Sequence, residues 1–438
     1  MVHLGRESSL SNHHHDVSGK GFKHLTPTIE ALKAVTEKLP KRASENETVP
    51  VSAALGRILG QDLISYTDIP SFDRAAMDGF AVRAEDTYGA TVSSPIFLRV
   101  VGQIDFGGTP QVGLNKGEAT LVVTGGRMPQ GANAVAMVEY TKQVSDGTVE
   151  VSGEVHPAEN VSRVGEDVRK GTVVLKEGAR LLPQDIGMLS CLGFTEVSVK
   201  RRLKIAVLST GNEIQERPTA MSGKVPDINR PILLNAVREL GCEPIDMGIA
   251  IDEFGQIRDK LDQAIQRADI IVVTAGTSVG PGDIVPQVID SLGKPGMLVH
   301  GVAMRPSMPT GLGVVNGKPV ISLPGYPVSA YLALLEFLPS IIGHMLGTNS
   351  LPRPVVKAKL RRRVAGVLGS RTYVRVQVAE RGGNLFVDPV RTSGAGILSS
   401  LVQANGFIIV PEHVEGYEEG QTVEVELFRP VEREQTGK

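Results

Sequence analysis

The strongest pattern along the chain is a series of short apolar runs that alternate with amphipathic segments between about residues 203 and 347. Three of these runs consist mostly of branched aliphatic residues, as is typical of strands buried on both faces: 205–208, 270–273 and 320–323. Segments whose apolar residues have helical spacing lie between them, most clearly at 256–267. Strands and helices that alternate with short links predict a doubly wound α/β domain, in which helices cover both faces of a parallel sheet.

Alternation of apolar and polar residues marks two other blocks as β-rich. Near the end of the chain, 374–378 and 422–427 alternate with a period of two, which predicts the half-buried strands of a small β barrel or sandwich. A block at about 66–158 contains β-branched runs and a hairpin signal at 145–147. The segment that follows this block is predicted to pack back onto the first helices of the chain, so the block is interpreted as an insertion.

These patterns predict a multidomain α/β protein. Its parts are a disordered tail at 1–25, a split scaffold domain at 26–65 and 159–202, an inserted β-rich domain at 66–158, a central doubly wound α/β domain at 203–348 and a C-terminal β-barrel domain at 349–438. The tail contains His13, His14 and His15, which are either metal ligands or part of a solvated terminus.

Composition and charge exclude several classes of protein. The 46 lysines and arginines are balanced by 48 acids, and aromatic residues make up only 4% without any tryptophan, so a nucleic-acid-binding protein is not expected. The two cysteines, Cys191 and Cys242, belong to no CxxC motif, which disfavours a disulfide framework or a zinc site. No apolar run reaches the roughly 18 residues of a membrane helix, and no signal-peptide core begins the chain. A cytoplasmic protein without a membrane partner is expected.

Polar residues and glycines follow each predicted strand of the α/β domain. In a parallel sheet these points meet at the carboxyl edge, where ligands bind. Glycines and hydroxyl groups allow backbone N–H groups to approach an anion, and carboxylates beside that anion favour a bridging Mg²⁺. The candidates are Thr210, Gly211 and Glu213 after the first strand, Asp252 after the second, Gly276, Ser278, Gly280 and Asp283 after the third, and Pro324, Gly325 and Ser329 after the fourth.

Ordinary turns and helix caps explain any one of these loops alone, but the convergence of four of them favours a binding site. The loops contain neither the P-loop nor the dinucleotide-binding fingerprint. Two further segments combine acids with small and apolar residues, at 70–82 with Asp78 and at 163–167 with Asp167. Each of these two is also compatible with a solvated turn.

Six motifs occur along the chain in a fixed order: FDRAAMDGFAV, TGGRMPQGANAVAM, RVGEDV, VLSTGNE, TAGTSVGPGD and LPGYPVSA. Together they resemble the MoeA-type molybdopterin molybdenumtransferases, a family that includes the E domain of gephyrin, over nearly all of the chain after about Thr26. The resemblance implies an elongated homodimer built from the same four domains. It also implies Mg²⁺-dependent insertion of molybdate into adenylylated molybdopterin, with release of AMP. Its implied partners are a molybdopterin adenylyltransferase and the molybdoenzymes or tungstoenzymes that accept the cofactor.

The functional positions of the family fall on suitable residues in this chain. The resemblance implies catalytic roles for five acids and a substrate contact for Thr124: the acids are Asp78, Asp167, Glu213, Asp252 and Asp283, and the last three are the implied Mg²⁺ ligands. Such acids can hold Mg²⁺ and handle protons or a nucleophilic water at the adenylate phosphate. In the family, the site around Asp78 and Thr124 is completed across the dimer.

The chain departs from the family where anions are expected to bind. The stretch 301–309 reads GVAMRPSMP in place of the family's Lys-x-x-x-Lys-Pro-Gly-Lys-Pro, so Gly301 and Met308 replace lysines, Ser307 replaces a glycine, and Arg305 keeps one charge. Arg305 is therefore the expected oxyanion anchor, and a lysine restored at Ser307 or Met308 is expected to strengthen oxyanion binding. A family serine falls on Ala395.

Three functions stay open on the sequence alone. They are insertion of molybdate or tungstate, molybdopterin adenylylation, and a binding or scaffold role in a protein that has lost turnover. A basic segment of the last domain either approaches phosphates or forms a solvated strand face: Lys357, Lys359, Arg361, Arg362 and Arg363.

Overall fold

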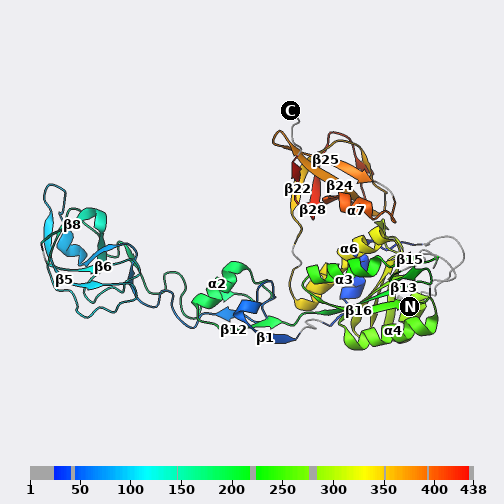
Figure 1. Cartoon of the computed structure of the whole chain (residues 1–438), viewed down its shortest axis with the longest axis horizontal. Coiled ribbons are helices and arrows are strands. Elements are labelled where there is room, and N and C mark those ends of the chain that lie inside the picture. Colours follow the sequence, from blue (N-terminus) through cyan, green and yellow to red (C-terminus); the bar gives the residue numbers. More distant parts are fainter. Residues whose placement is uncertain are drawn as a thin grey trace, which may run out of the picture. The chain divides into compact units, whose positions relative to one another are not determined.

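A computed structural model of the chain describes residues 24–40, 45–145, 147–217, 223–275, 284–349, 352–391 and 394–433. Contacts divide the chain into two compact units, one of residues 46–199 and one that joins 1–45 to 200–438. Figure 1 shows the elements of both units. The predicted tail at 1–25 lies almost wholly outside the described residues.

The larger unit contains a six-stranded sheet with the order β16-β13-β17-β21-β20-β18. Its four parallel strands are β13 (Lys204–Thr210), β16 (Glu243–Ala250), β17 (Ile270–Ala275) and β21 (Lys318–Pro324).

The remaining two strands of this sheet are antiparallel to their neighbours, so the sheet is mixed at this edge, whereas the four predicted strands are parallel. β20 (Gly311–Val315) pairs with β21, and β18 (Pro295–His300) pairs with β20. Asn316 and Gly317 connect β20 to β21 with φ values of 51° and 77°. Asn-Gly favours such a tight hairpin turn because both residues tolerate positive φ.

Helices cover both faces of the sheet, which confirms the doubly wound domain. α3 (Asn229–Glu239) and α6 (Pro327–Leu346) lie on one face, and α4 (Phe254–Arg267) and α5 (Val285–Leu292) cover the other (Figure 1). Successive residues of β13 face opposite sides, because strand side chains alternate. Ile205 and Val207 accordingly join the core under α3 and α6, whereas Ala206 and Leu208 join the core under α4 and α5.

Helix α1 (Thr28–Thr36) belongs to this α/β core and not to the scaffold domain to which the sequence analysis assigned it. Its apolar stripe, with Ala31 and Val35, is buried in the same cluster as α6. The Thr26 N–H donates a hydrogen bond to the carbonyl of Gly301 at 3.0 Å. The stripe was visible in the sequence, but its partner lies more than 260 residues away along the chain.

Helix α6 has the length and apolarity of a membrane span, although no uninterrupted apolar run marks it in the sequence. In this fold 67% of its most apolar window is buried inside the protein. Its apolar side chains, such as Phe337 and Ile341, fill the core between the sheet and the C-terminal domain.

The C-terminal domain is a closed five-stranded barrel. Of the two predicted alternatives, a barrel or a sandwich, the barrel is therefore confirmed. The strands follow one another around the barrel as β24 (Arg371–Arg381), β25 (Asn384–Arg391), β22 (Val355–Leu360), β28 (Thr422–Leu427) and β26 (Gly406–Val410), which pairs with β24 again. Val374, Val376 and Val378 of β24 fill its interior.

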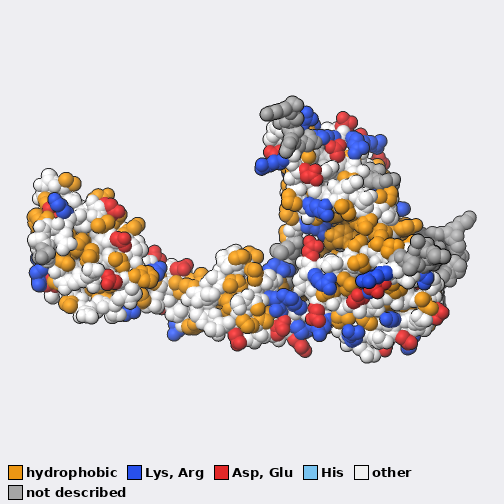
Figure 2. Space-filling view, viewed as in Figure 1, with side chains coloured by type: hydrophobic (Ala, Val, Ile, Leu, Met, Phe, Trp, Pro, Cys, Tyr) orange, Lys and Arg blue, Asp and Glu red, His pale blue; other side chains and the backbone are white. Residues whose placement is uncertain are grey.

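The barrel is docked on helix α6. The Tyr373 hydroxyl of β24 donates a hydrogen bond to Glu336 of α6, and the Arg371 guanidinium lies 3.5 Å from the same carboxylate. β19 (Met304–Arg305) of the α/β domain also pairs with the first residues of β24. Apolar side chains gather where the barrel meets the α/β domain (Figure 2). The two domains therefore share one core.

The smaller unit contains a second six-stranded sheet, which confirms the β-rich domain. Its order is β7 (Ala134–Met137), β4 (Gly79–Val82), β6 (Glu118–Val122), β5 (Ile96–Ile104), β9 (Thr148–Val151) and β8 (Thr141–Ser145). Gly79 is required in β4 because a Cβ there would lie 2.1 Å from the carbonyl oxygen of Ala136.

Segments before and after this sheet pair with each other in the rest of the smaller unit. β1 (Asn46–Pro50) pairs with β12 (Glu196–Lys200), and β2 (Leu63–Ile64) with β11 (Val173–Leu175), beside helix α2 (Pro183–Cys191). Short elements complete the two units: η1 (Val51–Ala53), η2 (Ala84–Thr87), η3 (Val138–Tyr140), β23 (Val364–Ala365), α7 (Ser399–Gln403), β27 (Gly416–Tyr417) and β29 (Glu432–Arg433).

Candidate functional site

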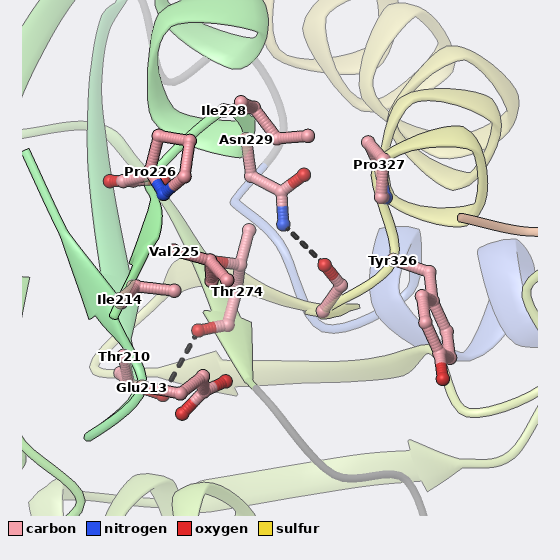
Figure 3. A pocket seen from close by; sticks show the side chains of 12 residues that line it. Thr210, Glu213, Ile214, Val225, Pro226, Ile228, Asn229, Thr274, Tyr326 and Pro327 are labelled. Atoms are coloured by element: carbon pink, nitrogen blue, oxygen red, sulfur yellow. Dashed lines mark hydrogen bonds between the residues drawn. The ribbon is translucent and has the colours of Figure 1, made fainter. Parts of the chain in front are cut away.

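A pocket of about 380 Å³ lies at the carboxyl edge of the α/β sheet (Figure 3). It is lined by residues after β13, around the short strands β14 (Ile214–Gln215) and β15 (Val225–Pro226), at the start of α3 and before α6. Thr210, Glu213 and Gly325 were predicted for this site and line the pocket. Its position agrees with the rule that ligands of open α/β sheets bind at the carboxyl ends of the strands.

Hydroxyl groups at the pocket floor join the strand ends. The Thr210 hydroxyl donates a hydrogen bond to the carbonyl of Thr274 at 3.0 Å, and both threonines are buried (Figure 3). Thr274 also contacts the Ser209 hydroxyl at 3.4 Å. Thr210 therefore holds β13 against β17, a structural role that the sequence analysis did not assign to it.

Asn229 connects helix α3 to the loop before α6. Its Nδ2 donates a hydrogen bond to the carbonyl of Gly325 at 2.7 Å, which fixes the orientation of the amide (Figure 3). Its Oδ1 is buried and accepts no hydrogen bond from the described residues. A buried acceptor without a partner costs about 1–3 kcal/mol. The hydrogen bond to Gly325 and the packing around Asn229 must offset this cost.

The residue after Asn229 anchors the pocket wall to the sheet. Arg230 is buried, and its guanidinium contacts Asp227 at 3.1 Å, Asp246 at 2.7 Å and Glu216 at 3.1 Å. Burial opposes ionisation of Asp246, but hydrogen bonds from Arg230 outweigh it and hold the pKa of Asp246 below its ordinary value. The charge cluster thus ties the loop that carries Asp227 to strand β16.

The acids of the rim come from loops that hold each other. The Asn212 N–H donates to Asp252 at 3.3 Å, and the Asp252 N–H donates back to the Asn212 side chain at 3.2 Å. Glu213 folds over the backbone of Gly211, where a Cβ would lie 2.9 Å from its carboxylate. The loops after β13 and β16 therefore meet, as predicted from the parallel strands.

The third loop carries the predicted residues Gly276, Ser278, Gly280 and Asp283, and it lies outside the described residues. Within the described ranges, no three acids, histidines or cysteines are close enough to form a metal centre. Mg²⁺ commonly uses one or two carboxylates and completes its coordination with water and substrate phosphates. The exposed carboxylates of Glu213 and Asp252 fit that kind of site and not an all-protein cage.

The predicted residues of the smaller unit form a second constellation. The backbone N–H and the hydroxyl of Thr124 both donate to one carboxylate oxygen of Asp78, at 2.6 and 2.7 Å. The backbone hydrogen bond and then the hydroxyl hold the pKa of Asp78 below its ordinary value. The predicted pair is thus assembled, with Asp78 exposed and ionised.

The acidic turn with Asp167 lies next to the segment that precedes Asp78. β3 (Arg74–Ala75) pairs with β10 (Val161–Ser162), and the Val164 N–H donates to Asp73 at 2.8 Å. Glu166 caps the turn through Ser162 and the Arg163 N–H, whereas Asp167 contributes its N–H to the carbonyl of Ile69 and has an exposed side chain.

The stretch that departs from the family is part of the α/β core. Ser307 is only 3% exposed, has a φ of 113° and donates its hydroxyl to the carbonyl of Ser329 at 2.7 Å. A lysine at position 307 would therefore replace a buried, hydrogen-bonded hydroxyl, and its effect on oxyanion binding stays a prediction. Arg305 is exposed and Met308 half-buried.

Other predicted residues lie beside the pocket without lining it. Pro324 and Ser329 are buried. The carbonyl of Ala395, in a barrel loop, accepts a hydrogen bond from the Val328 N–H at 3.1 Å, so the barrel reaches the start of α6. Ion pairs occupy four residues of the basic segment, as expected for a solvated strand face: Arg361 and Arg362 with Asp388, Arg363 with Glu418, and Lys357 with Glu424.

Comparison with known proteins agrees with this arrangement. Residues 26–193 match the model of the MoeA N-terminal region, 206–344 that of a probable molybdopterin binding domain, and 357–428 that of the MoeA C-terminal region. A putative molybdopterin biosynthesis protein of Methanocaldococcus jannaschii is 37% identical over 94% of this chain and 100% of its own length. The chain belongs to the MoeA family.

Other members of the MoeA family extend the comparison. Molybdopterin molybdenumtransferase 2 of Mycobacterium tuberculosis is 33% identical over 88% of this chain and 95% of its own length. The crystal structure of the molybdopterin biosynthesis MoeA protein of Pyrococcus horikoshii matches with a TM-score of 0.81 and 34% identity, over 92% of this chain and 100% of that one. The curated relatives in this comparison include several enzymes, and this MoeA-family chain is therefore an enzyme.

Nine of the twelve pocket residues were not predicted for this site from the sequence, and three of them carry polar groups at its wall. Asp227 and Asn229 precede and begin helix α3, and Tyr326 belongs to the motif LPGYPVSA. Asp-Ile-Asn before a helix is also an ordinary helix start, so the signal was present but not specific. Tyr326 was visible within a motif of predicted site residues, but only the fold shows that its side chain lines the pocket.

Replacement of Thr124 tests the pair formed with Asp78. We expect Thr124→Val to raise the pKa of Asp78, because the hydroxyl donor is lost and a donor favours the carboxylate. Thr124→Ser, which keeps the hydroxyl, is expected to leave the pKa low. Carbon-13 NMR titration of labelled aspartate, assigned with Asp78→Asn, measures it. An unchanged titration in Thr124→Val would show that the hydroxyl does not act on Asp78.

Proposed function

We propose that this MoeA-family enzyme inserts molybdate, or tungstate, into adenylylated molybdopterin and releases AMP in a Mg²⁺-dependent reaction. The observation that carries the proposal is the pocket at the carboxyl edge of the domain that matches the molybdopterin-binding family model, with Glu213 in its wall. The names of the curated molybdenumtransferases support this reaction class.

The acids at the rim of the sheet support the proposal. Glu213 and Asp252 are the described carboxylates that would hold Mg²⁺, and Asp283 is the third candidate. When bound, the cation would neutralise charge on the adenylate phosphate. The hydrogen bonds between Asn212 and Asp252 keep the two loops together, so that the carboxylates are positioned before a substrate arrives.

Asp78 is an acid of the smaller unit and does not belong to the rim of the α/β sheet. The two donors of Thr124 hold the pKa of Asp78 below its ordinary value and thereby stabilise the carboxylate form. An exposed carboxylate that is stabilised in this way can attract a cation, in line with its proposed catalytic role. Asp167 is proposed to take part because the family resemblance implies a catalytic role for it. Its side chain is exposed and lies beside the segment that leads to Asp78.

Turnover with defined substrates tests the function directly. Purified protein with adenylylated molybdopterin, Mg²⁺ and molybdate is expected to release AMP and form the metal-containing cofactor together. Consumption of ATP with free molybdopterin would identify an adenylyltransferase instead. Substrate binding without AMP release would identify a binding or scaffold protein. Heat-inactivated protein and omission of molybdate serve as controls.

Arg305 tests the oxyanion site of the proposal. We expect Arg305→Ala to raise the oxyanion concentration required for half-maximal cofactor formation by about tenfold, because a partly desolvated charge contact contributes about 1–2 kcal/mol. Met308→Lys is expected to lower that concentration. Titrations with molybdate and tungstate measure both effects, and Arg258→Ala, an exposed arginine on α4, is the matched control. Identical titrations for Arg305→Ala and wild type would place the oxyanion elsewhere.

We also propose that the enzyme is a cytoplasmic homodimer that works with a molybdopterin adenylyltransferase and with cofactor-accepting enzymes. Asp78 and Glu213 belong to different units of the chain, so mixed dimers test their cooperation. Asp78→Ala and Glu213→Ala are each expected to be inactive, and exchange of their subunits is expected to restore partial activity. Complete inactivity after verified subunit exchange would show that each site uses residues of a single chain.

A further inference from the structure

Tyr326 is an exposed aromatic residue in the wall of the pocket. Tyr326 is 65% exposed. Its two neighbours in the chain are less exposed, because Gly325 is half-buried and Pro327 is buried. Figure 3 shows the ring nearly edge-on at the border of the pocket, separated from the polar groups of Glu213 and Asn229. A large aromatic surface that is left in water at a ligand pocket is available for contact with a ligand.

The backbone around Tyr326 is held on both sides. Its carbonyl accepts a hydrogen bond from the Ala330 N–H at 2.9 Å, which begins helix α6. The carbonyl of the preceding residue, Gly325, accepts the 2.7 Å hydrogen bond of Asn229. The ring therefore extends from a backbone segment whose neighbours are fixed to two helices, and little ordering is required when a ligand arrives.

A loop of the barrel lies close to the ring. A Cβ placed on Gly396 would lie 3.2 Å from Cδ1 and 3.5 Å from Cε1 of Tyr326. The hydrogen bond from Val328 to Ala395, at 3.1 Å, holds this barrel loop against the first turn of α6. A side chain at position 396 would crowd the ring. Glycine at this position therefore allows the ring to lie where it does.

The pocket combines this aromatic surface with hydrogen-bonding groups, which is the arrangement that a planar heterocycle requires. Its volume of about 380 Å³ is within the range of small-molecule sites. Polar side chains of the pocket can form hydrogen bonds with the edge of such a ring, and the face of Tyr326 offers a surface on which the ring can stack. An adenine ring offers the same kind of face, so binding experiments must separate the two ends of the substrate.

We propose that Tyr326 stacks on the pterin ring of adenylylated molybdopterin and, with Gly396 behind it, determines the affinity for that end of the substrate. This inference rests on the proposed function. Tyr326 acts through contact of its ring and not through its hydroxyl, because stacking requires only the aromatic face. Its role is therefore one of binding and specificity, while the acids of the rim serve the chemistry.

Binding of two separate probes by the full-length protein tests the proposal. Quenching of the fluorescence of free pterin measures the pterin end, and calorimetry with AMP measures the adenylate end. The variants are Tyr326→Ala, Tyr326→Phe and Gly396→Val, with Tyr88→Ala as the control for loss of an exposed tyrosine elsewhere. Thermal unfolding confirms that each variant is folded.

The expected result is a selective loss of pterin affinity. Tyr326→Ala is expected to weaken pterin binding by about 5- to 150-fold, the range measured for loss of one stacked base. Tyr326→Phe and Tyr88→Ala are expected to remain within about twofold of wild type, and Gly396→Val to lie between them and Tyr326→Ala, because its side chain displaces the ring. In turnover, Tyr326→Ala is expected to raise KM and leave kcat nearly unchanged.

Three results would overturn the inference. Unchanged pterin and AMP binding in Tyr326→Ala would show that the ring contacts neither end, and loss of AMP affinity alone would show that it stacks on adenine. A loss in Tyr326→Phe equal to that in Tyr326→Ala would show that the hydroxyl, and not the ring, makes the contact. Failure of the proposed function is distinguishable, since wild-type protein would then bind pterin through Tyr326 without releasing AMP from the adenylylated substrate.

Discussion

Parallel pairing of four buried strands is the constraint on which the site depends. β13 lies between β16 and β17, and β17 pairs in turn with β21. The register brings Thr210 opposite Ala250, Ser209 opposite Thr274 and Ala275 opposite Pro324, so the four strands end at the same level of the sheet. Loops from distant parts of the sequence must therefore leave the sheet together, and the pocket forms where they do.

Hydrogen bonds between these loops make the pocket wall a connected structure. Asn229 joins α3 to Gly325, Asn212 joins its loop to Asp252, and the Arg230 cluster ties the wall to β16. Arg230 is the cation shared by the three acids of its cluster, so its removal would leave the buried carboxylate of Asp227 without compensation, which is destabilising. The wall is thus preorganised, and binding energy of a substrate is not required to assemble it.

The barrel is part of the site through its docking on helix α6. Burial raises the pKa of Tyr373, and Glu336 adds to the effect, so Tyr373 remains a neutral donor to that carboxylate. This contact and the pairing of β19 with β24 hold the barrel loop at Ala395 and Gly396 against the start of α6. Ser307 also serves the core: it is buried, and its hydroxyl donates a hydrogen bond to the carbonyl of Ser329. The family resemblance alone had suggested that anions bind at this stretch.

The sequence by itself determined the doubly wound domain, the β-rich blocks and the position of the rim acids, because strand and helix periodicity and the order of six motifs are local properties. It also contains the Asn316-Gly317 turn that connects the antiparallel strands β20 and β21. Only the tertiary structure decided that α1 packs under α6, that Thr210 is a structural hydroxyl, that Ser307 is buried and that Tyr326 lines the pocket. Each of these depends on contacts between residues that are far apart in the chain, and the periodicity of a single segment carries no information about which partner will cover it.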